Sequence, residues 1–122
     1  MTNGLVPKGV AYVELETTPE PEHFVFLLLP NLSMLAFSAA IEPLRIANQL
    51  TGKVLYRWTM MSEGGQSVRC SNGVELGVDC AIGDTPSGAY VFACSGVEPE
   101  KASSRKATDW LRYQWRTGRV VG

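Results

Sequence analysis

The sequence predicts an α/β domain in which a mainly parallel sheet is covered by helices. Residues 23–29 and 89–94 are almost continuously apolar, and strands of this kind are buried on both faces, as in parallel sheets. Segments with helical periodicity alternate with such strands along the chain. This alternation is typical of a helix-covered parallel sheet. A chain of 122 residues has the size of one ordinary domain.

The first predicted unit is the strand at 23–29 followed by a long helix. Ser33 is a suitable N-cap for a helix from Met34 to about Leu50. Pro43 lies inside this helix and is expected to kink it rather than end it. Gly52, after Thr51, supplies the stop.

This helix is expected to be covered on more than one side. It carries no charge before Glu42, and its first half is apolar or small around the whole circumference. One side can pack on the sheet, and a second subunit is the expected cover for the other. The predicted interface residues are Phe37, Ile41, Glu42 and Arg45. A surface ion pair between Glu42 and Arg45 is the alternative for these two.

The rest of the chain alternates strands and a second helix. We predict a strand at 56–62, a hairpin of 67–70 with 74–78, a strand at 89–94, a helix at 106–117 and a further strand from 119. Asn72-Gly73 favours the hairpin turn. The core face of the second helix is predicted to consist of Ala107, Trp110, Leu111 and Trp115. The strand that begins at 119 should lead to a loop and another helix on the sheet, so we expect the chain to be a fragment of a longer protein.

Composition and charge argue against several classes of protein. The net charge is −1 and no basic run exceeds Arg105-Lys106, so the chain is not expected to bind DNA by itself. No apolar stretch has the length of a membrane span or a signal peptide, so a cytoplasmic location is expected. Residues 17–22 are polar and twice interrupted by proline, which predicts a flexible leader at 1–22 before a domain at 23–122.

Cysteines and glycines indicate no metal or cofactor. Three cysteines at wide spacing predict no disulfide framework, and with a single histidine they make a poor zinc site. Cys70 and Cys80 are interpreted as packing residues. The pair Gly52-Lys53 lacks the upstream glycine of a phosphate-binding loop, and no G-x-G-x-x-G follows a strand.

Several short motifs follow one another through residues 24–122. They are Phe26-Leu27-Leu28-Leu29-Pro30, Ser33, Glu42-Pro43-Leu44-Arg45-Ile46-Ala47-Asn48, Leu55-Tyr56-Arg57-Trp58, Ser71-Asn72-Gly73-Val74, Val78-Asp79, Gly83-Asp84 and the strand at 90–93. Each motif alone is weak, but their shared order is specific. Together they resemble the opening of AraC-family transcription regulators whose sensor domain is of the DJ-1/PfpI kind.

The resemblance implies a fold and a function. The fold would be a flavodoxin-like three-layer sandwich, related to class I glutamine amidotransferases and truncated here before the superfamily's strand-to-helix elbow. The function would be to sense a small effector, an amino acid or a quaternary amine such as betaine or carnitine. DNA would be bound only by a helix-turn-helix region absent from this chain. A homodimer contact would carry the signal to that region.

An enzyme of the same superfamily is the alternative. It would be a cysteine-dependent hydrolase, a glyoxalase or an isonitrile hydratase. The resemblance places the elbow cysteine just after Gly122 and its supporting glutamate near Ala36, so catalysis is not expected. Cys94 also ends a strand, but His23 begins one and is expected at the opposite rim of the sheet. Cys94 is therefore predicted to be a packing residue rather than a nucleophile.

The predicted ligand site lies in two loops at the carboxyl ends of the apolar strands, where open α/β sheets bind their ligands. Its residues are Pro30, Asn31, Leu32, Cys94, Ser95, Gly96 and Val97. Their backbone N–H groups could bind a carboxylate. Asn31-Leu32 replaces the Gly-Phe frequent in relatives, and Cys94-Ser95-Gly96 stands where Gly-Gly is common, which could alter the pocket floor.

Overall fold

The central strand of the protein is β1 (Glu22–Leu28), which pairs in parallel with β2 (Tyr56–Ser62) on one side and with β6 (Tyr90–Cys94) on the other. The computed structural model describes residues 19–122, so most of the predicted leader lies outside the described residues. The five-stranded sheet has the order β5-β2-β1-β6-β7, and each neighbouring pair in it is parallel. The predicted juxtaposition of the two apolar segments in one sheet is confirmed.

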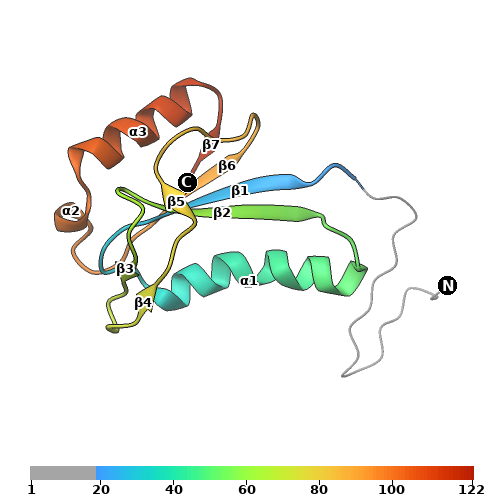
Figure 1. Ribbon diagram of the computed structural model, residues 1–122, viewed down its shortest axis with the longest axis horizontal. Coiled ribbons are helices and arrows are strands. Elements are labelled where there is room, and N and C mark those ends of the chain that lie inside the picture. The colour runs from blue at the N-terminus through green and yellow to red at the C-terminus, as the bar shows by residue number, and fades with distance from the viewer. Residues whose placement is uncertain (1–18) are drawn as a thin grey trace.

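Helices cover this sheet on both faces. The remaining elements are α1 (Met34–Thr51), β3 (Val68–Arg69), β4 (Glu75–Leu76), β5 (Cys80–Ala81), α2 (Pro99–Ala102), α3 (Arg105–Arg116) and β7 (Val120–Val121). Figure 1 shows α1 on one side of the sheet and α3 on the other, which confirms the predicted α/β architecture in three layers. Among residues 19–122, no helix is long and apolar enough to cross a membrane.

The core has two halves because successive residues of β1 point to opposite faces of the sheet. Phe26 and Leu28 pack with Phe37 of α1. Val25 and Leu27 belong to the half that α3 covers. All four of these β1 side chains are at most 1% exposed. Burying a side chain of this size stabilises the fold by about 1.5–3 kcal/mol.

Helix α1 begins and ends where the sequence predicts. The Ser33 side chain accepts a hydrogen bond from the Ala36 N–H at 3.1 Å, and Gly52 ends the helix in the left-handed conformation with φ of 66°. Pro43 lies inside the helix on its exposed side. There the carbonyl four residues earlier can bond to water, so the proline costs less than in a buried helix.

The chain covers only one side of α1. Phe37 is the one α1 residue that is fully buried, and Leu35 is 82% exposed. Phe37 and Ile41 were predicted at a subunit interface, but both pack into the chain's own core. They face inward because the apolar side of α1 that carries them is the side toward the sheet. Arg45 pairs with Glu42, so the ion pair predicted as the alternative is present.

The predicted hairpin is confirmed, with short strands. Val68 pairs with Leu76 and Arg69 with Glu75, and the Asn72 side chain accepts a hydrogen bond from the Val74 N–H at 3.0 Å. Cys70 is buried in the core beside α1, as predicted. Cys80 is exposed, so its prediction as a packing residue is wrong. It lies in β5, a two-residue edge strand that the sequence did not predict.

Helix α3 corrects one predicted core residue. Ala107, Trp110 and Leu111 pack against the sheet as predicted, but Trp115 is 70% exposed. Gln114 is buried in its place, since 100° per residue puts Gln114 closer to the direction of Ala107. The Gln114 side-chain oxygen accepts a 2.6 Å hydrogen bond from the Thr85 hydroxyl, which offsets the cost of burial. The short helix α2 was not predicted.

Asn48 fastens the end of α1 to the start of β2. Its side-chain oxygen accepts hydrogen bonds from the N–H groups of Leu55 and Tyr56 at 2.8 and 3.1 Å. Its side-chain nitrogen donates to the Tyr56 carbonyl at 2.9 Å. A single amide therefore satisfies three backbone groups of the connection, which explains why Asn suits this position.

We predict that Asn48→Ala lowers the free energy of unfolding by about 2–4 kcal/mol, because three partly buried backbone groups lose their partners. Urea denaturation followed by circular dichroism measures the change. Gln49→Ala is the matched control at the neighbouring exposed position, where a change within about 0.5 kcal/mol is expected. Equal losses for the two variants would contradict this role of Asn48.

Candidate functional site

The two predicted site loops meet at the carboxyl ends of β1 and β6. The Leu29 N–H donates to the Cys94 carbonyl at 3.0 Å, and the Ser33 N–H donates to the Ser95 carbonyl at 3.1 Å. Leu32 forms an isolated bridge with Gly96. From β1 the chain continues to β2 on one side of this junction, and from β6 it continues to β7 on the other side. The junction between β1 and β6 is therefore the topological switch point of the sheet, where open α/β folds bind ligands.

The loop around Leu32 is occupied by contacts within the protein. Leu32 is fully buried, so it is not placed to touch a ligand as the sequence predicted. The Asn31 N–H donates to the Arg69 carbonyl at 2.9 Å, and the Leu32 carbonyl accepts from the Ser71 N–H at 3.0 Å. Because these backbone groups already have partners, the N–H groups of Asn31 and Ser33 are not free to bind a carboxylate.

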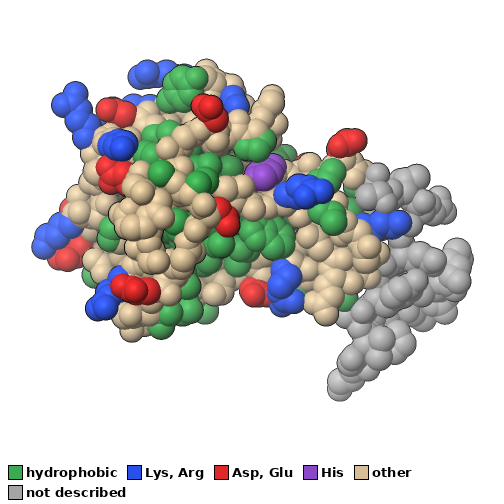
Figure 2. Space-filling model, viewed as in Figure 1, with side chains coloured by type: hydrophobic (Ala, Val, Ile, Leu, Met, Phe, Trp, Pro, Cys, Tyr) green, Lys and Arg blue, Asp and Glu red, His purple; other side chains and the backbone are tan. Residues whose placement is uncertain are grey.

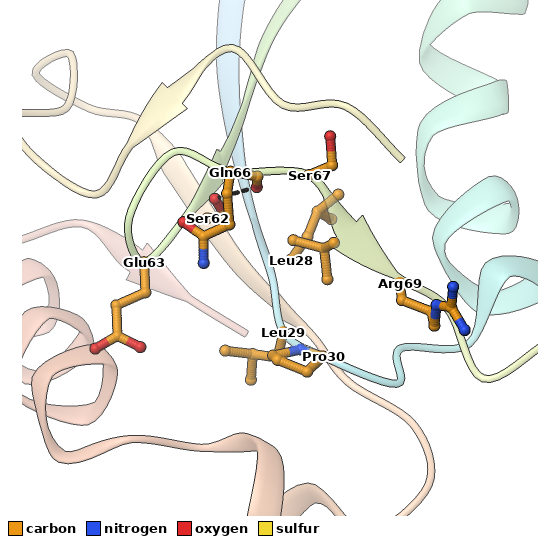
Figure 3. Close-up of a pocket in the computed structure, with 9 residues that line it drawn as sticks. Leu28, Leu29, Pro30, Ser62, Glu63, Gln66, Ser67 and Arg69 are labelled. Carbon is orange, nitrogen blue, oxygen red and sulfur yellow. Dashed lines mark hydrogen bonds between the residues drawn. The ribbon is translucent and has the colours of Figure 1, made fainter. Parts of the chain in front are cut away.

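Three of the remaining predicted residues, Pro30, Cys94 and Ser95, divide between two cavities. The first has a volume of about 110 Å³ and includes Pro30 in its wall. Its lining comes from the ends of β1 and β2 and from β3: Leu28, Leu29, Pro30, Ser62, Glu63, Gln66, Ser67, Val68 and Arg69. Figure 3 shows Glu63 and Arg69 on opposite sides of this cavity, with Leu28 between them and Leu29 and Pro30 below.

Charge and polarity are unevenly distributed in this first cavity. The Ser62 hydroxyl is committed, since it donates to the Gln66 carbonyl at 2.7 Å and so shapes the turn. Glu63 and Arg69 form no ion pair among residues 19–122, so each has its charge available. The cavity thus lies between a Glu63 and an Arg69 whose charged ends point outward in Figure 3, and its floor is apolar.

The second cavity is a groove between α1 and β6 of about 310 Å³. Cys94 and Ser95 line it together with Ser33, Ala36, Phe37, Ala40, Phe92 and Ala93. Ala36, at the position where the family resemblance places a supporting glutamate, contributes only a methyl group. The groove is therefore mainly apolar.

Cys94 is half-buried at the groove, and this partial burial governs the acidity of its thiol. Burial raises its pKa from 9.0 to about 11, because the thiolate would lose its hydration. His23 lies at the other end of β1, where its Nε2 is 2.7 Å from the Thr59 hydroxyl oxygen. Burial, and then the charge of Arg57, lowers the pKa of His23. Neither residue helps the other toward nucleophilic chemistry.

Gly96 allows the two loops to approach each other. A Cβ at this position would lie 2.5 Å from the Asn31 carbonyl oxygen and 2.7 Å from the Ser33 nitrogen. Both are backbone atoms, so a side chain at 96 would push the loops apart. Val97 is 59% exposed and lines neither cavity.

Comparison with known proteins identifies relatives. No family model matches the sequence. The chain is 37% identical over 102 residues to the HTH-type transcriptional regulator GbdR of Pseudomonas aeruginosa, which covers 84% of this chain but only 28% of GbdR. Its fold matches an AraC family transcriptional regulator from Pseudomonas putida with a TM-score of 0.72 at 24% identity, covering 84% of this chain and 63% of that one.

The chain is similar in sequence to an HTH-type transcriptional regulator and in fold to an AraC-family regulator, as the family resemblance implied. Its fold also matches a DJ-1 superfamily protein from Agrobacterium tumefaciens with a TM-score of 0.60 at 13% identity, over 82% of this chain and 51% of that one. The predicted family and flavodoxin-like fold are confirmed. The chain spans little more than a quarter of the length of GbdR.

The sequence prediction missed most of the first cavity. The missed residues are Ser62, Glu63, Gln66, Ser67 and Arg69. A signal for them was present, because the turn Glu63-Gly64-Gly65-Gln66 follows the second parallel strand and therefore lies at the same edge of the sheet as Pro30. The position of Arg69 was not predictable in this way, since it depends on the hairpin folding back over that edge.

We predict that Gly96→Ala destabilises the chain by about 1–3 kcal/mol, because a methyl group would overlap backbone atoms. Thermal unfolding followed by circular dichroism measures the loss. Gly77→Ala is the matched control, since a Cβ at Gly77 meets nothing within 4 Å. A loss at Gly96 no greater than that at Gly77 would show that the loops do not need this close approach.

Proposed function

We propose that the chain is the effector-sensing module of an AraC-type transcription regulator, in which a separate helix-turn-helix region binds DNA. Supporting this, GbdR is a regulator of the HTH type and shares 37% identity with 84% of the chain. A regulator of this kind would work in the cytoplasm, where its DNA is.

The effector is proposed to be an amino acid or a quaternary amine bound in the first cavity. The observation that carries this assignment is the opposed pair of Glu63 and Arg69 across a small cavity at the carboxyl edge of the sheet. By turning inward about their side-chain bonds, Arg69 would bind the effector carboxylate through its planar guanidinium and Glu63 would face the ammonium group. The floor of Leu28, Leu29 and Pro30 would contact the aliphatic or methyl groups.

Effector binding can reach α1 through backbone contacts. Arg69 accepts the Asn31 N–H through its carbonyl, and Ser33, two residues later, caps α1. A shift of β3 toward the effector would therefore act on the loop that starts α1. We propose that this contact passes the signal to a homodimer interface on α1.

The interface would use the outward side of α1. Its exposed apolar or small residues are Leu35, Ala39, Pro43 and Ile46. They lie opposite Phe37, with Glu42 and Arg45 beside them. A second copy of the chain is the proposed cover, because two such stripes of small side chains can pack closely. Glu42 and Arg45 keep their predicted place at its edge.

An enzymatic function is not proposed. Ala36 supplies no carboxylate at the position of the superfamily's glutamate, and burial keeps the Cys94 thiol protonated at neutral pH. The Cys94 thiolate that a hydrolase or glyoxalase mechanism needs would form only as the pH approaches about 11.

We predict that a panel of amino acids and quaternary amines, including glycine betaine and carnitine, contains a compound that binds the chain. Isothermal titration calorimetry is expected to show Arg69→Gln weakening that binding about tenfold or more, because a charge-assisted pair is lost. Glu63→Gln is expected to weaken it to a similar degree. Arg57→Gln, an exposed cation at the amino half of β2, is the control and should bind as the unaltered chain does. Binding unaffected by both cavity variants would contradict the assigned site.

We predict that the chain is dimeric at micromolar concentration and that Leu35→Glu makes it monomeric, because a carboxylate would be buried in an apolar contact. Sedimentation velocity distinguishes the two states. Val74→Glu is the matched control, since Val74 is an exposed apolar residue at the hairpin, away from the proposed interface. A monomeric unaltered chain, or a Leu35→Glu variant that stays dimeric, would refute the interface.

A further inference from the structure

Helix α3 carries much of the positive charge of the protein. Five of the ten Lys and Arg residues in the described chain fall within residues 105–119, against the single carboxylate of Asp109. The rest of the described chain has an excess of carboxylates. Figure 2 shows Lys and Arg side chains gathered on the upper left of the molecule, where Figure 1 places α3. The molecule is therefore electrostatically polarised, although its net charge is close to zero.

The cations of α3 form a row on its outward side. At 100° per residue, Arg105, Arg112 and Arg116 point away from buried Ala107 and Gln114. Asp109 lies in the same row and is shared, with 3.9 Å to Arg105 and 3.5 Å to Arg112. One shared carboxylate leaves the row with excess positive charge.

Two exposed aromatic side chains flank this row. Tyr113 is 60% exposed and Trp115 is 70% exposed, and their helical positions place them on opposite sides of the arginines. Nothing in the fold of residues 19–122 uses these rings, whereas Trp110 on the same helix is anchored by a hydrogen bond from its ring N–H to the Gly83 carbonyl. A row of arginines between an exposed Trp and an exposed Tyr has the composition of a protein-binding hot spot.

The composition favours a protein partner over nucleic acid. Binding to the phosphates of duplex DNA needs only the cations, and the aromatic rings would gain nothing there. Carboxylates of a protein segment can pair with the guanidinium groups while apolar side chains between them cover the rings. An acidic protein segment with apolar side chains would therefore contact both the arginines and the aromatic rings of this surface.

We propose that the outward face of α3, formed by Arg105, Arg112, Tyr113, Trp115 and Arg116, is a docking surface for an acidic protein segment that also carries apolar side chains. The surface lies on the face of the sheet opposite α1 and is separate from the effector cavity. The contact goes beyond effector sensing, because α3 would bind a separate, acidic protein partner. Neither the proposed effector nor the proposed interface on the outward side of α1 involves α3.

Fluorescence anisotropy with a labelled synthetic peptide of alternating glutamate and leucine tests this proposal on the 122-residue chain. The peptide is expected to bind, and its affinity should fall as salt is added because the ion pairs are screened. The double variant Arg112→Glu, Arg116→Glu is expected to reduce affinity about tenfold or more. Trp115→Ala, which removes an exposed side chain and should leave the fold intact, is expected to weaken binding severalfold.

The matched control is Lys53→Glu, Arg57→Glu, which changes the net charge equally at the start of β2 and is expected to bind as the unaltered chain does. Circular dichroism checks that every variant is folded. The proposal is overturned if the peptide does not bind at low salt, or if the control loses as much affinity as the α3 variant. It is also overturned if duplex DNA binds more tightly than the peptide and is indifferent to Trp115→Ala. These outcomes do not depend on the effector, so the test can fail while effector sensing stands.

Discussion

The burial of β1 on both faces is the constraint on which the rest of the structure depends. A strand with four consecutive residues at most 1% exposed needs a hydrogen-bonded neighbour at each edge and a covering layer on each face. The neighbours are β2 and β6, and the layers are α1 and α3. Parallel pairing in turn requires each helix to carry the chain back across a face of the sheet. The three-layer architecture follows from the apolar run 24–29.

That architecture also decides where chemistry can occur. Parallel strands end at the same edge, so the loops after β1, β2 and β6 converge there. Between β1 and β6, Leu32 packs directly against the backbone of Gly96, so the two loops fill the space where a ligand would otherwise bind. Between β1 and β2 the hairpin stands back from the edge, and a small cavity with opposed charges remains. The same hydrogen bonds that close one space connect the other to the start of α1.

The motif at residues 42–48 resembles one in AraC-family regulators, and the structure explains several of its residues. Asn48 binds the backbone at the start of β2, and Pro43 sits where its missing N–H is tolerated. Glu42 and Arg45 pair on the helix surface. These residues maintain α1 and its outward side rather than forming a catalytic centre, which agrees with a module that transmits a signal.

The sequence by itself determined the order of the main elements, the parallel character of the sheet and the edge at which the strand-end loops meet. These features depend on local periodicity, capping at Ser33 and Gly52, and a geometric rule for open sheets, all of which are readable without coordinates. The short elements β5 and α2 escaped prediction because two to four residues carry too weak a periodic signal.

Only the tertiary structure decided which side chains are free. It turned Phe37 and Ile41 inward, buried Leu32, exposed Trp115 and Cys80, and brought Arg69 opposite Glu63. A residue's type limits what it can contact, but its exposure depends on how the whole chain packs around it, and that packing is set by contacts distant in sequence. The fold was therefore largely predictable, whereas the side chains around the candidate cavity at the carboxyl edge of the sheet were not.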